Sequence, residues 1–398
     1  MTPTRPETRR AQSEPTPAPR DDVVFTFSFE TYADAVRRGM MRPPDRIVMS
    51  LMESPQVDGL LVANPYRWMP RVLASGLVDR DARFPETDRR WLLSPTRLRR
   101  TDRLDPVEVE REYTTYDAAL EHGVRRRRLR SPVALTANPL VAGFAPMAWA
   151  RRSTFFARDD WLSSPSRQDY WPAFREAYTR ISASGRGVVA VSRQILERIA
   201  PTGPAEVVPN GVEPAEWLRP QPEPPAWLAR IPGPRAVYVG TLDSRLDVDG
   251  IASLARARPD LQIVLLGPLP DPTYIAALAR SENVHVHPSV GREQLIATLR
   301  NADVCLVAHR RTALTEAMSP LKLYEYLAAG VPVLSIDLPP VRGVSDRVLL
   351  VDTVADFADV VDDALGLGAA AEADRRAFVA ANSWAARHER VIAFACGA

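Results

Sequence analysis

Two charged side chains three residues apart, Lys322 and Glu325, are the clearest groups in the sequence for binding a ligand. This spacing puts both on one face of a helix. A lysine in the first turn of a helix is unfavourable by itself, because the helix N-terminus already carries a partial positive charge. The lysine is favourable at this position if it and the helix N-terminus together bind an anion such as a phosphate. A carboxylate one turn further on can accept hydrogen bonds from the diol of a ribose. The pair therefore predicts a nucleotide site.

The residues around this pair predict a helix followed by a buried strand. Ser319 is a suitable N-cap, and Pro320 fits the first helical position, where no N–H is needed. Gly330 can adopt the left-handed conformation that ends a helix. The apolar run 331–336 then fits a parallel strand that is covered on both faces.

Lys322 is also the only lysine in a chain with 50 arginines. So large an excess of arginine indicates codon bias, and the one remaining lysine suggests that an ammonium is needed there rather than a planar guanidinium. The alternative is a chance remainder on a solvated helix face.

The run from Ser319 to Val333 resembles the donor-binding signature of GT-B glycosyltransferases, nearest to glycosyltransferase family 4 and to bacterial exopolysaccharide enzymes. The resemblance implies that Glu325 holds the ribose of a nucleotide-sugar donor. It also implies that the donor diphosphate is held by Lys322 and the loop before it, namely Ser319, Pro320 and Leu321. Many retaining members carry a glutamate eight residues before the ribose-binding one. Here that position is Ala317, with Glu316 one place away, so retention or inversion stays open.

A second motif lies one domain-length earlier, where an apolar strand at 236–239 enters a glycine turn. Gly240 and Thr241 would let a phosphate approach the backbone, and Arg245 is the candidate second cation on the diphosphate. His309 lies at the end of the strand before the predicted helix that carries Lys322, and is a weaker candidate for reaching the donor sugar or phosphate. Two cations and a helix dipole make a metal ion unnecessary, so we expect metal-independent chemistry without a cofactor.

Two adjacent carboxylates, Asp159 and Asp160, follow an apolar strand predicted at 153–157. Ligands of open α/β sheets bind at the carboxyl ends of strands, so either residue is a candidate general base for an acceptor hydroxyl if the reaction inverts. The alternative is that one of them caps the following helix.

The chain has 398 residues, of which 45% are hydrophobic and 25% charged, and is long enough for two domains of roughly 150–200 residues. Alternating strands and helices predict an α/β fold, and the resemblance implies the GT-B architecture of two Rossmann-like domains. The predicted divisions are a disordered tail at 1–20, an acceptor-side domain at 21–202, a donor-binding domain at 203–365 and a helical segment at 366–398 that crosses back. Two cysteines and no apolar run of membrane-spanning length predict a cytoplasmic protein.

The charge is uneven: residues 1–200 carry a net +8 and residues 201–398 a net −6. The basic half, which includes the run 125–128, could contact an anionic membrane surface or acceptor, or be an ordinary solvated surface. Nucleic acid is not favoured, because no recognised module accompanies the charge. His285 and His287 alternate in a strand without a third metal ligand, so a structural role is favoured.

The sequence therefore predicts a glycosyltransferase of bacterial cell-surface polysaccharide biosynthesis. It would move a sugar from a nucleotide-diphosphate donor to a glycan, lipid-linked or small-molecule acceptor. Two alternatives remain open: a GT-B nucleotide-sugar epimerase, and a non-catalytic nucleotide-sugar-binding partner of a polysaccharide assembly complex. A dinucleotide oxidoreductase is disfavoured, because no strand is followed by G-x-G-x-x-G.

Overall fold

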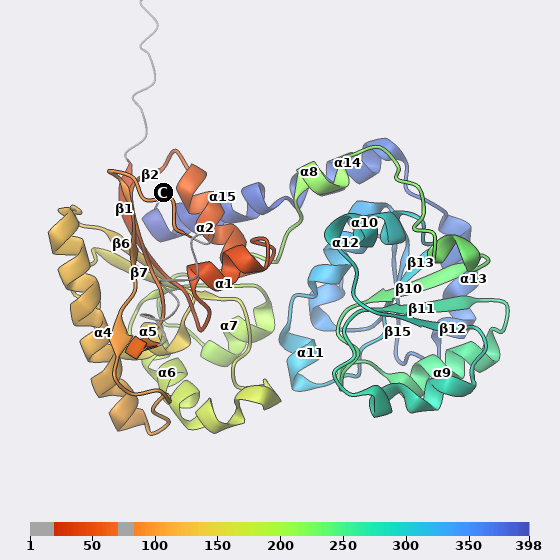
Figure 1. Cartoon of the computed structure of the whole chain (residues 1–398), viewed down its shortest axis with the longest axis horizontal. Coiled ribbons are helices and arrows are strands. Elements are labelled where there is room, and N and C mark those ends of the chain that lie inside the picture. The colour runs from red at the N-terminus through yellow and green to blue at the C-terminus, as the bar shows by residue number, and fades with distance from the viewer. Residues whose placement is uncertain (1–19, 71–82, 398) are drawn as a thin grey trace, which may run out of the picture.

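A computed structural model describes residues 20–70 and 83–397 of the chain. The predicted disordered tail lies outside the described residues, apart from residue 20. Two parallel sheets, each covered by helices, form the two halves of the molecule (Figure 1), as the α/β expectation requires.

The first sheet has seven parallel strands in the order β4-β2-β1-β6-β7-β8-β9. In this order they are Arg90–Leu93, Val57–Ala63, Asp21–Thr26, Val133–Thr136, Arg152–Ala157, Gly187–Ala190 and Ala205–Val207. The second sheet has six parallel strands in the order β12-β11-β10-β13-β14-β15. They are Val284–His287, Gln262–Leu266, Arg235–Val239, Val304–Val307, Val333–Ile336 and Val348–Val351. A short parallel pair joins β3 (Arg67–Trp68) to β5 (Thr96–Arg97).

Helices connect these strands in sequence. Around the first sheet lie α1 (Tyr32–Arg37), α2 (Pro43–Glu53), α4 (Pro106–Arg127), α5 (Pro139–Phe144), α6 (Trp171–Ala183) and α7 (Arg193–Ile199), with the 3₁₀ helix η1 (Pro165–Tyr170). Between the sheets lies α8 (Pro214–Trp217), followed by η2 (Leu228–Arg230). Around the second sheet lie α9 (Val248–Ala257), η3 (Pro272–Arg280), α10 (Arg292–Arg300), α11 (Ala313–Ala317), α12 (Leu321–Ala329), η4 (Pro339–Val341) and α13 (Phe357–Leu367). The chain ends with α14 (Glu372–Ala381) and α15 (Trp384–Cys396).

The key helix, α12, starts one residue later than predicted. Its N-cap is Pro320 and not Ser319, and no side chain caps it. The Ser319 hydroxyl instead accepts a hydrogen bond from the Asn210 backbone N–H, at 3.3 Å, so it is engaged by the linker between the sheets. At the other end, Gly330 adopts φ 83°, the left-handed conformation that was predicted.

The longest helix of the first half, α4, was not predicted, because its segment is highly charged. It has 22 residues, with Asp105 as N-cap and Arg125, Arg126 and Arg127 in its last turn. Cations at a helix C-terminus complement the partial negative charge there. The arginine run thus lies at the exposed end of a helix, which fits both readings given above.

The polypeptide passes between the halves twice at one place. The first sheet extends to β9, which lies beyond the predicted division at 202/203. After β9 the chain crosses to the second half, and on the way Val212 pairs with Ser383 in an isolated parallel bridge. The chain then returns to the first half as α15, which packs against α2 and β7 (Figure 1). The Ser50 hydroxyl and His388 Nδ1 are 2.7 Å apart and fix this return.

Candidate active site

The site is built at the carboxyl ends of β10 and β13, beside the first turn of α12. The Lys322 Nζ lies 3.2 Å from His309 Nε2 and 3.7 Å from the centroid of the Tyr238 ring. A Cβ added at Gly240 would lie 2.8 Å from the same Nζ, so a larger residue there would collide with the lysine. The glycine turn and the lysine, predicted from separate motifs, are therefore brought into contact.

The Lys322 ammonium has no carboxylate within 4.0 Å among residues 20–70 and 83–397. Burial lowers the pKa of Lys322 well below its usual value, and the nearby Arg245 guanidinium lowers it further. Its closest contacts are an aromatic face and an imidazole, neither of which neutralises its charge. A partly buried cation of this kind is poised to bind an anion.

His309 is buried, with 2% of its surface exposed. Burial, together with Lys322 and Arg245, lowers its pKa well below the usual value, so the imidazole is neutral at pH 7. A neutral ring can accept a hydrogen bond from the lysine at Nε2 and carry its proton on Nδ1. Nδ1 is buried and has no hydrogen-bond partner among the described residues.

Arg245, the predicted second cation, is held in place by Asp243. Its Nε and Nη2 donate to the two carboxylate oxygens of Asp243 at 2.9 and 2.7 Å. Hydrogen bonding to Asp243 raises the pKa of Arg245, and the carboxylate of Asp159 in the other half of the molecule also raises it. Thr241 lies half-buried in the turn between Gly240 and this pair.

Glu325 is 8% exposed and is hydrogen-bonded to a residue that sequence reasoning missed. Arg292, the first residue of α10, donates from Nη1 to Glu325 Oε1 at 2.5 Å and from Nη2 to Glu216 Oε2 at 2.6 Å. Glu216 also pairs with Arg46 of α2, at 3.0 Å. None of the sequence motifs included Arg292, so no sequence signal pointed to this contact.

The loop before α12 contacts the linker between the halves. The Asn210 side-chain amide donates to the Ser319 carbonyl at 2.8 Å. Leu321 opens the helix and is partly exposed, as is Lys322, whereas Pro320 is buried. The three loop residues predicted for the diphosphate are thus next to the lysine in space as well as in sequence.

The two candidate bases have different surroundings. Asp160 is 1% exposed, and its carboxylate forms an ion pair of 2.6 Å with Arg198 of α7. Asp159 has a side chain that is 45% exposed and is paired with Arg158 at 2.8 Å. Desolvation raises the pKa of Asp159, while Arg158 opposes the rise. Of the two carboxylates, only Asp159 is open to a ligand, and the buried pair of Asp160 is a structural contact of the first half.

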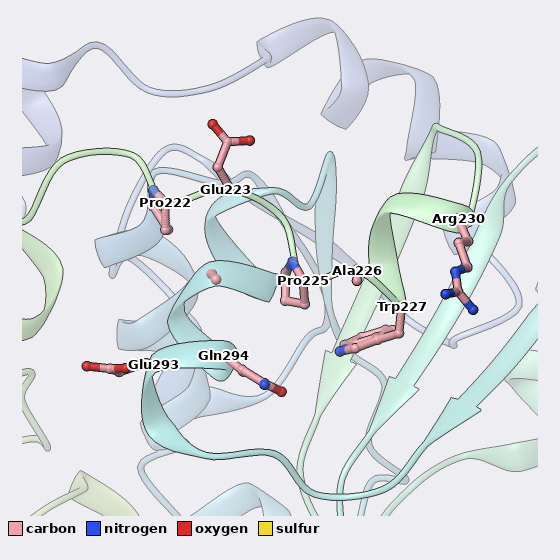
Figure 2. Close-up of a pocket in the computed structure, with 9 residues that line it drawn as sticks. Pro222, Glu223, Pro225, Ala226, Trp227, Arg230, Glu293 and Gln294 are labelled. Atoms are coloured by element: carbon pink, nitrogen blue, oxygen red, sulfur yellow. The ribbon is translucent and has the colours of Figure 1, made fainter.

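The two strand histidines have structural partners. His285 Nε2 lies 2.8 Å from Gln262 Oε1, and the His287 ring stacks on Trp227 with ring centroids 3.9 Å apart. Figure 2 shows Trp227 beside a hollow of about 560 Å³ between the loop at 222–227 and α10. This stack supports the carboxyl end of the edge strand β12. The described residues contain no cluster of three or more His, Cys, Asp or Glu side chains that could hold a metal ion.

Comparison with known proteins agrees with this geometry. Residues 233–366 match the family described as glycosyl transferases group 1. TuaH of Bacillus subtilis (strain 168), named as a teichuronic acid biosynthesis glycosyltransferase, is 28% identical over 106 residues, a match that spans 26% of each chain.

Solved structures resemble the whole described fold. A trehalose 6-phosphate synthase from Burkholderia multivorans has a TM-score of 0.65 at 14% identity, over 95% of this chain and 98% of that one. A sucrose-phosphate synthase from Thermosynechococcus elongatus has a TM-score of 0.64 at 13% identity, over 93% and 97%. An E. coli trehalose-6-phosphate protein bound to UDP-2-fluoro glucose has a TM-score of 0.63 at 13% identity, over 94% and 99%. At these identities the likeness is one of fold. The chain therefore carries a group 1 glycosyltransferase domain at residues 233–366 within a GT-B fold.

Proposed function

We propose that this protein transfers a sugar from a nucleoside diphosphate sugar to an acceptor that is a glycan, a lipid-linked molecule or a small molecule. The observation that carries the proposal is the ammonium of Lys322, set against the Gly240 turn without a carboxylate partner among the described residues. The relative bound to UDP-2-fluoro glucose supports the donor class. TuaH supports a role in bacterial cell-surface polysaccharide biosynthesis.

The leaving diphosphate would be stabilised by three fixed positive groups. Lys322 and Arg245 supply two cations, and α12 supplies free backbone N–H groups at its N-terminus. Because Asp243 already orients the Arg245 guanidinium, little reorganisation is needed when negative charge develops on the leaving group. The neutral His309 could add a hydrogen bond from Nδ1 to the donor phosphate or sugar.

Glu325 would accept hydrogen bonds from the donor ribose. One of its oxygens is engaged by Arg292, which leaves the other available for a hydroxyl group. Arg292 in turn is tied to Glu216 by two nitrogens. This support holds the carboxylate in one orientation, as a ribose site requires.

Asp159 would act as the general base on the acceptor hydroxyl if the reaction inverts. Its pKa is raised by desolvation, which makes it a better base than an ordinary carboxylate, and its side chain is accessible. The Asp159 carboxylate also contributes to the raised pKa of Arg245, so the two groups are close enough to interact electrostatically. Asp160, the other predicted base, is buried against Arg198, so Asp159 is the better placed of the two candidates.

The donor site is tested by thermal shift with UDP, GDP, TDP, CDP, ADP and NAD on the wild-type chain and on Lys322→Ala. We expect one diphosphate to raise the melting temperature, since a ligand that binds only the folded state stabilises it. The shift should vanish in Lys322→Ala and persist in Arg342→Ala, which removes a surface cation that pairs with Asp337 instead. Equal shifts in wild type and Lys322→Ala would refute the assignment.

Catalysis is tested separately with Asp159→Asn. This variant should keep the nucleotide shift and lose sugar transfer if Asp159 is the base. Full transfer would dismiss that role. Donor binding by the wild-type chain without consumption of any donor would favour the non-catalytic partner, and conversion of the donor to an isomeric nucleotide sugar would favour the epimerase.

The place of the protein in the cell stays a prediction. In the described residues no helix has both the length and the apolar character to cross a membrane. Contact of the arginine-rich first half with an anionic membrane surface is proposed on charge alone.

A further inference from the structure

A second cavity, in the first half of the molecule, has a lining that suits a charged sugar. It has a volume of about 570 Å³, within the range of small-molecule sites. Its walls come from segments that follow parallel strands: Phe29 after β1, Tyr66 and Trp68 after β2, and Arg100 after β5. The carboxyl ends of strands are where α/β sheets bind ligands.

Two of the arginines that line this cavity are not neutralised. Arg100 lies over the Trp68 ring at 5.7 Å, and Arg167 lies over the Phe29 ring at 4.7 Å. Neither has a carboxylate within 4.0 Å in the part of the chain that the structure describes. Arg97, in the same lining, shows the contrast, because it pairs with both Asp102 and Glu112.

Asp102, the one acidic side chain among the described residues of the lining, is already engaged. Its carboxylate pairs with Arg97, and it accepts a hydrogen bond from the Tyr170 hydroxyl at 2.5 Å. Arg100 and Arg167 therefore give the cavity a net positive charge. Guanidinium groups held over aromatic rings keep their planar donors free for a phosphate or a carboxylate.

The cavity is linked to the candidate base through residues 28–30. Phe29 lies between Ser28 and Glu30 in the chain, and both of these contact Arg158. Arg158 is the ion-pair partner of Asp159. One wall of the cavity, Phe29, is thus the chain neighbour of the two residues that contact the partner of Asp159.

We propose that this cavity is the acceptor site and that it selects an anionic saccharide, a sugar that carries a phosphate or a carboxylate. The inference rests on the proposed function, because it needs an acceptor hydroxyl within reach of Asp159. The anion binds to Arg100 and Arg167, and the sugar ring lies against the aromatic side chains. The sequence indicated a basic first half, and in this proposal two of its arginines bind the anionic group of the acceptor.

The test is calorimetric titration of the full chain with glucose 6-phosphate, glucuronate and glucose, each with and without the diphosphate that binds the donor site. We expect at least one anionic sugar to bind more tightly than glucose. The double variant Arg100→Gln/Arg167→Gln should weaken that binding by about tenfold or more, as expected for lost charge-assisted hydrogen bonds. A matched control, Arg125→Gln/Arg126→Gln, removes the same charge from the exposed end of α4 and should bind like wild type.

Comparing the three sugars shows which anionic group the cavity binds. Binding of glucose 6-phosphate alone assigns a phosphate, and binding of glucuronate alone assigns a carboxylate. The inference is overturned if neither binds better than glucose, or if the double variant binds as tightly as wild type. Nucleoside diphosphate binding is measured on the same samples, so intact donor binding with no preference for anionic sugars refutes this inference alone. Loss of nucleotide binding in wild type refutes the proposed function instead.

Discussion

Replacing Lys322 by methionine should separate stability from ligand binding. Methionine has a similar length and no charge, so it fills the space between Tyr238 and the Gly240 turn. The ammonium that it replaces has no carboxylate partner among the described residues, and burial lowers its pKa. The variant therefore removes a desolvated charge that the ligand-free protein does not use.

The magnitudes follow from these contacts. The variant loses a cation–π contact with Tyr238 and a hydrogen bond to His309, each worth about 1 kcal/mol, and gains by removing a buried charge and its repulsion from Arg245. We expect the free energy of unfolding to change by no more than about 1 kcal/mol. Breaking a buried ion pair would instead cost about 3–5 kcal/mol. Loss of a charge-assisted hydrogen bond to the diphosphate should weaken binding by about 10- to 150-fold.

Urea denaturation of the ligand-free proteins measures the first quantity, and calorimetric titration with the binding diphosphate measures the second. Unfolding midpoints that nearly coincide, with much weaker binding by Lys322→Met, would support the account. A variant destabilised by more than about 2 kcal/mol would make Lys322 a structural residue. A variant that binds the diphosphate as tightly as wild type would refute the donor site.

Three further predictions concern residues around the site. Arg292→Ala should lower the free energy of unfolding by about 2–4 kcal/mol, because it leaves the Glu325 carboxylate buried without its partner, and it should weaken nucleotide binding. Urea denaturation measures the first effect and calorimetric titration the second. A variant that matches wild type in both would contradict the positioning role of Arg292. Asp160→Asn should lower the free energy of unfolding by about 2 kcal/mol, because it breaks the ion pair with the partly exposed Arg198, and should leave nucleotide binding intact. Melting temperatures measured with and without nucleotide test both expectations. Burial lowers the pKa of His388 to about 3, below the ordinary value of 6.5, so the unfolded chain binds the proton first. Stability should therefore fall by about 1.4 kcal/mol per pH unit from pH 6.5 towards 3, a slope that His388→Gln should reduce and that an unchanged pH profile would contradict.

The donor-binding half could be predicted from the sequence because its signals are local. Pro320, Gly330 and the apolar run after it mark the ends of one helix and the start of one strand. The sequence assigned Lys322 and the Gly240 turn to the same diphosphate from separate motifs, and the structure brings the two together at the carboxyl ends of neighbouring parallel strands. The family resemblance assigned roles to residues that the local signals had already placed.

The parts that were missed depend on contacts distant in sequence. The Arg292–Glu325 pair joins residues 33 apart and gives no periodic signal. The helix α4 was hidden because its charged surface weakens the apolar period on which helix prediction relies. Adjacent residues at a strand end point in different directions, so only the structure could separate the exposed Asp159 from the buried Asp160.

The most direct test of the account is a crystal structure of the chain with its nucleoside diphosphate bound. The account predicts phosphate oxygens within about 3 Å of Lys322 Nζ and of the Arg245 guanidinium, with the ribose hydroxyls on the free oxygen of Glu325. A diphosphate bound elsewhere, with Lys322 still facing only Tyr238 and His309, would contradict it.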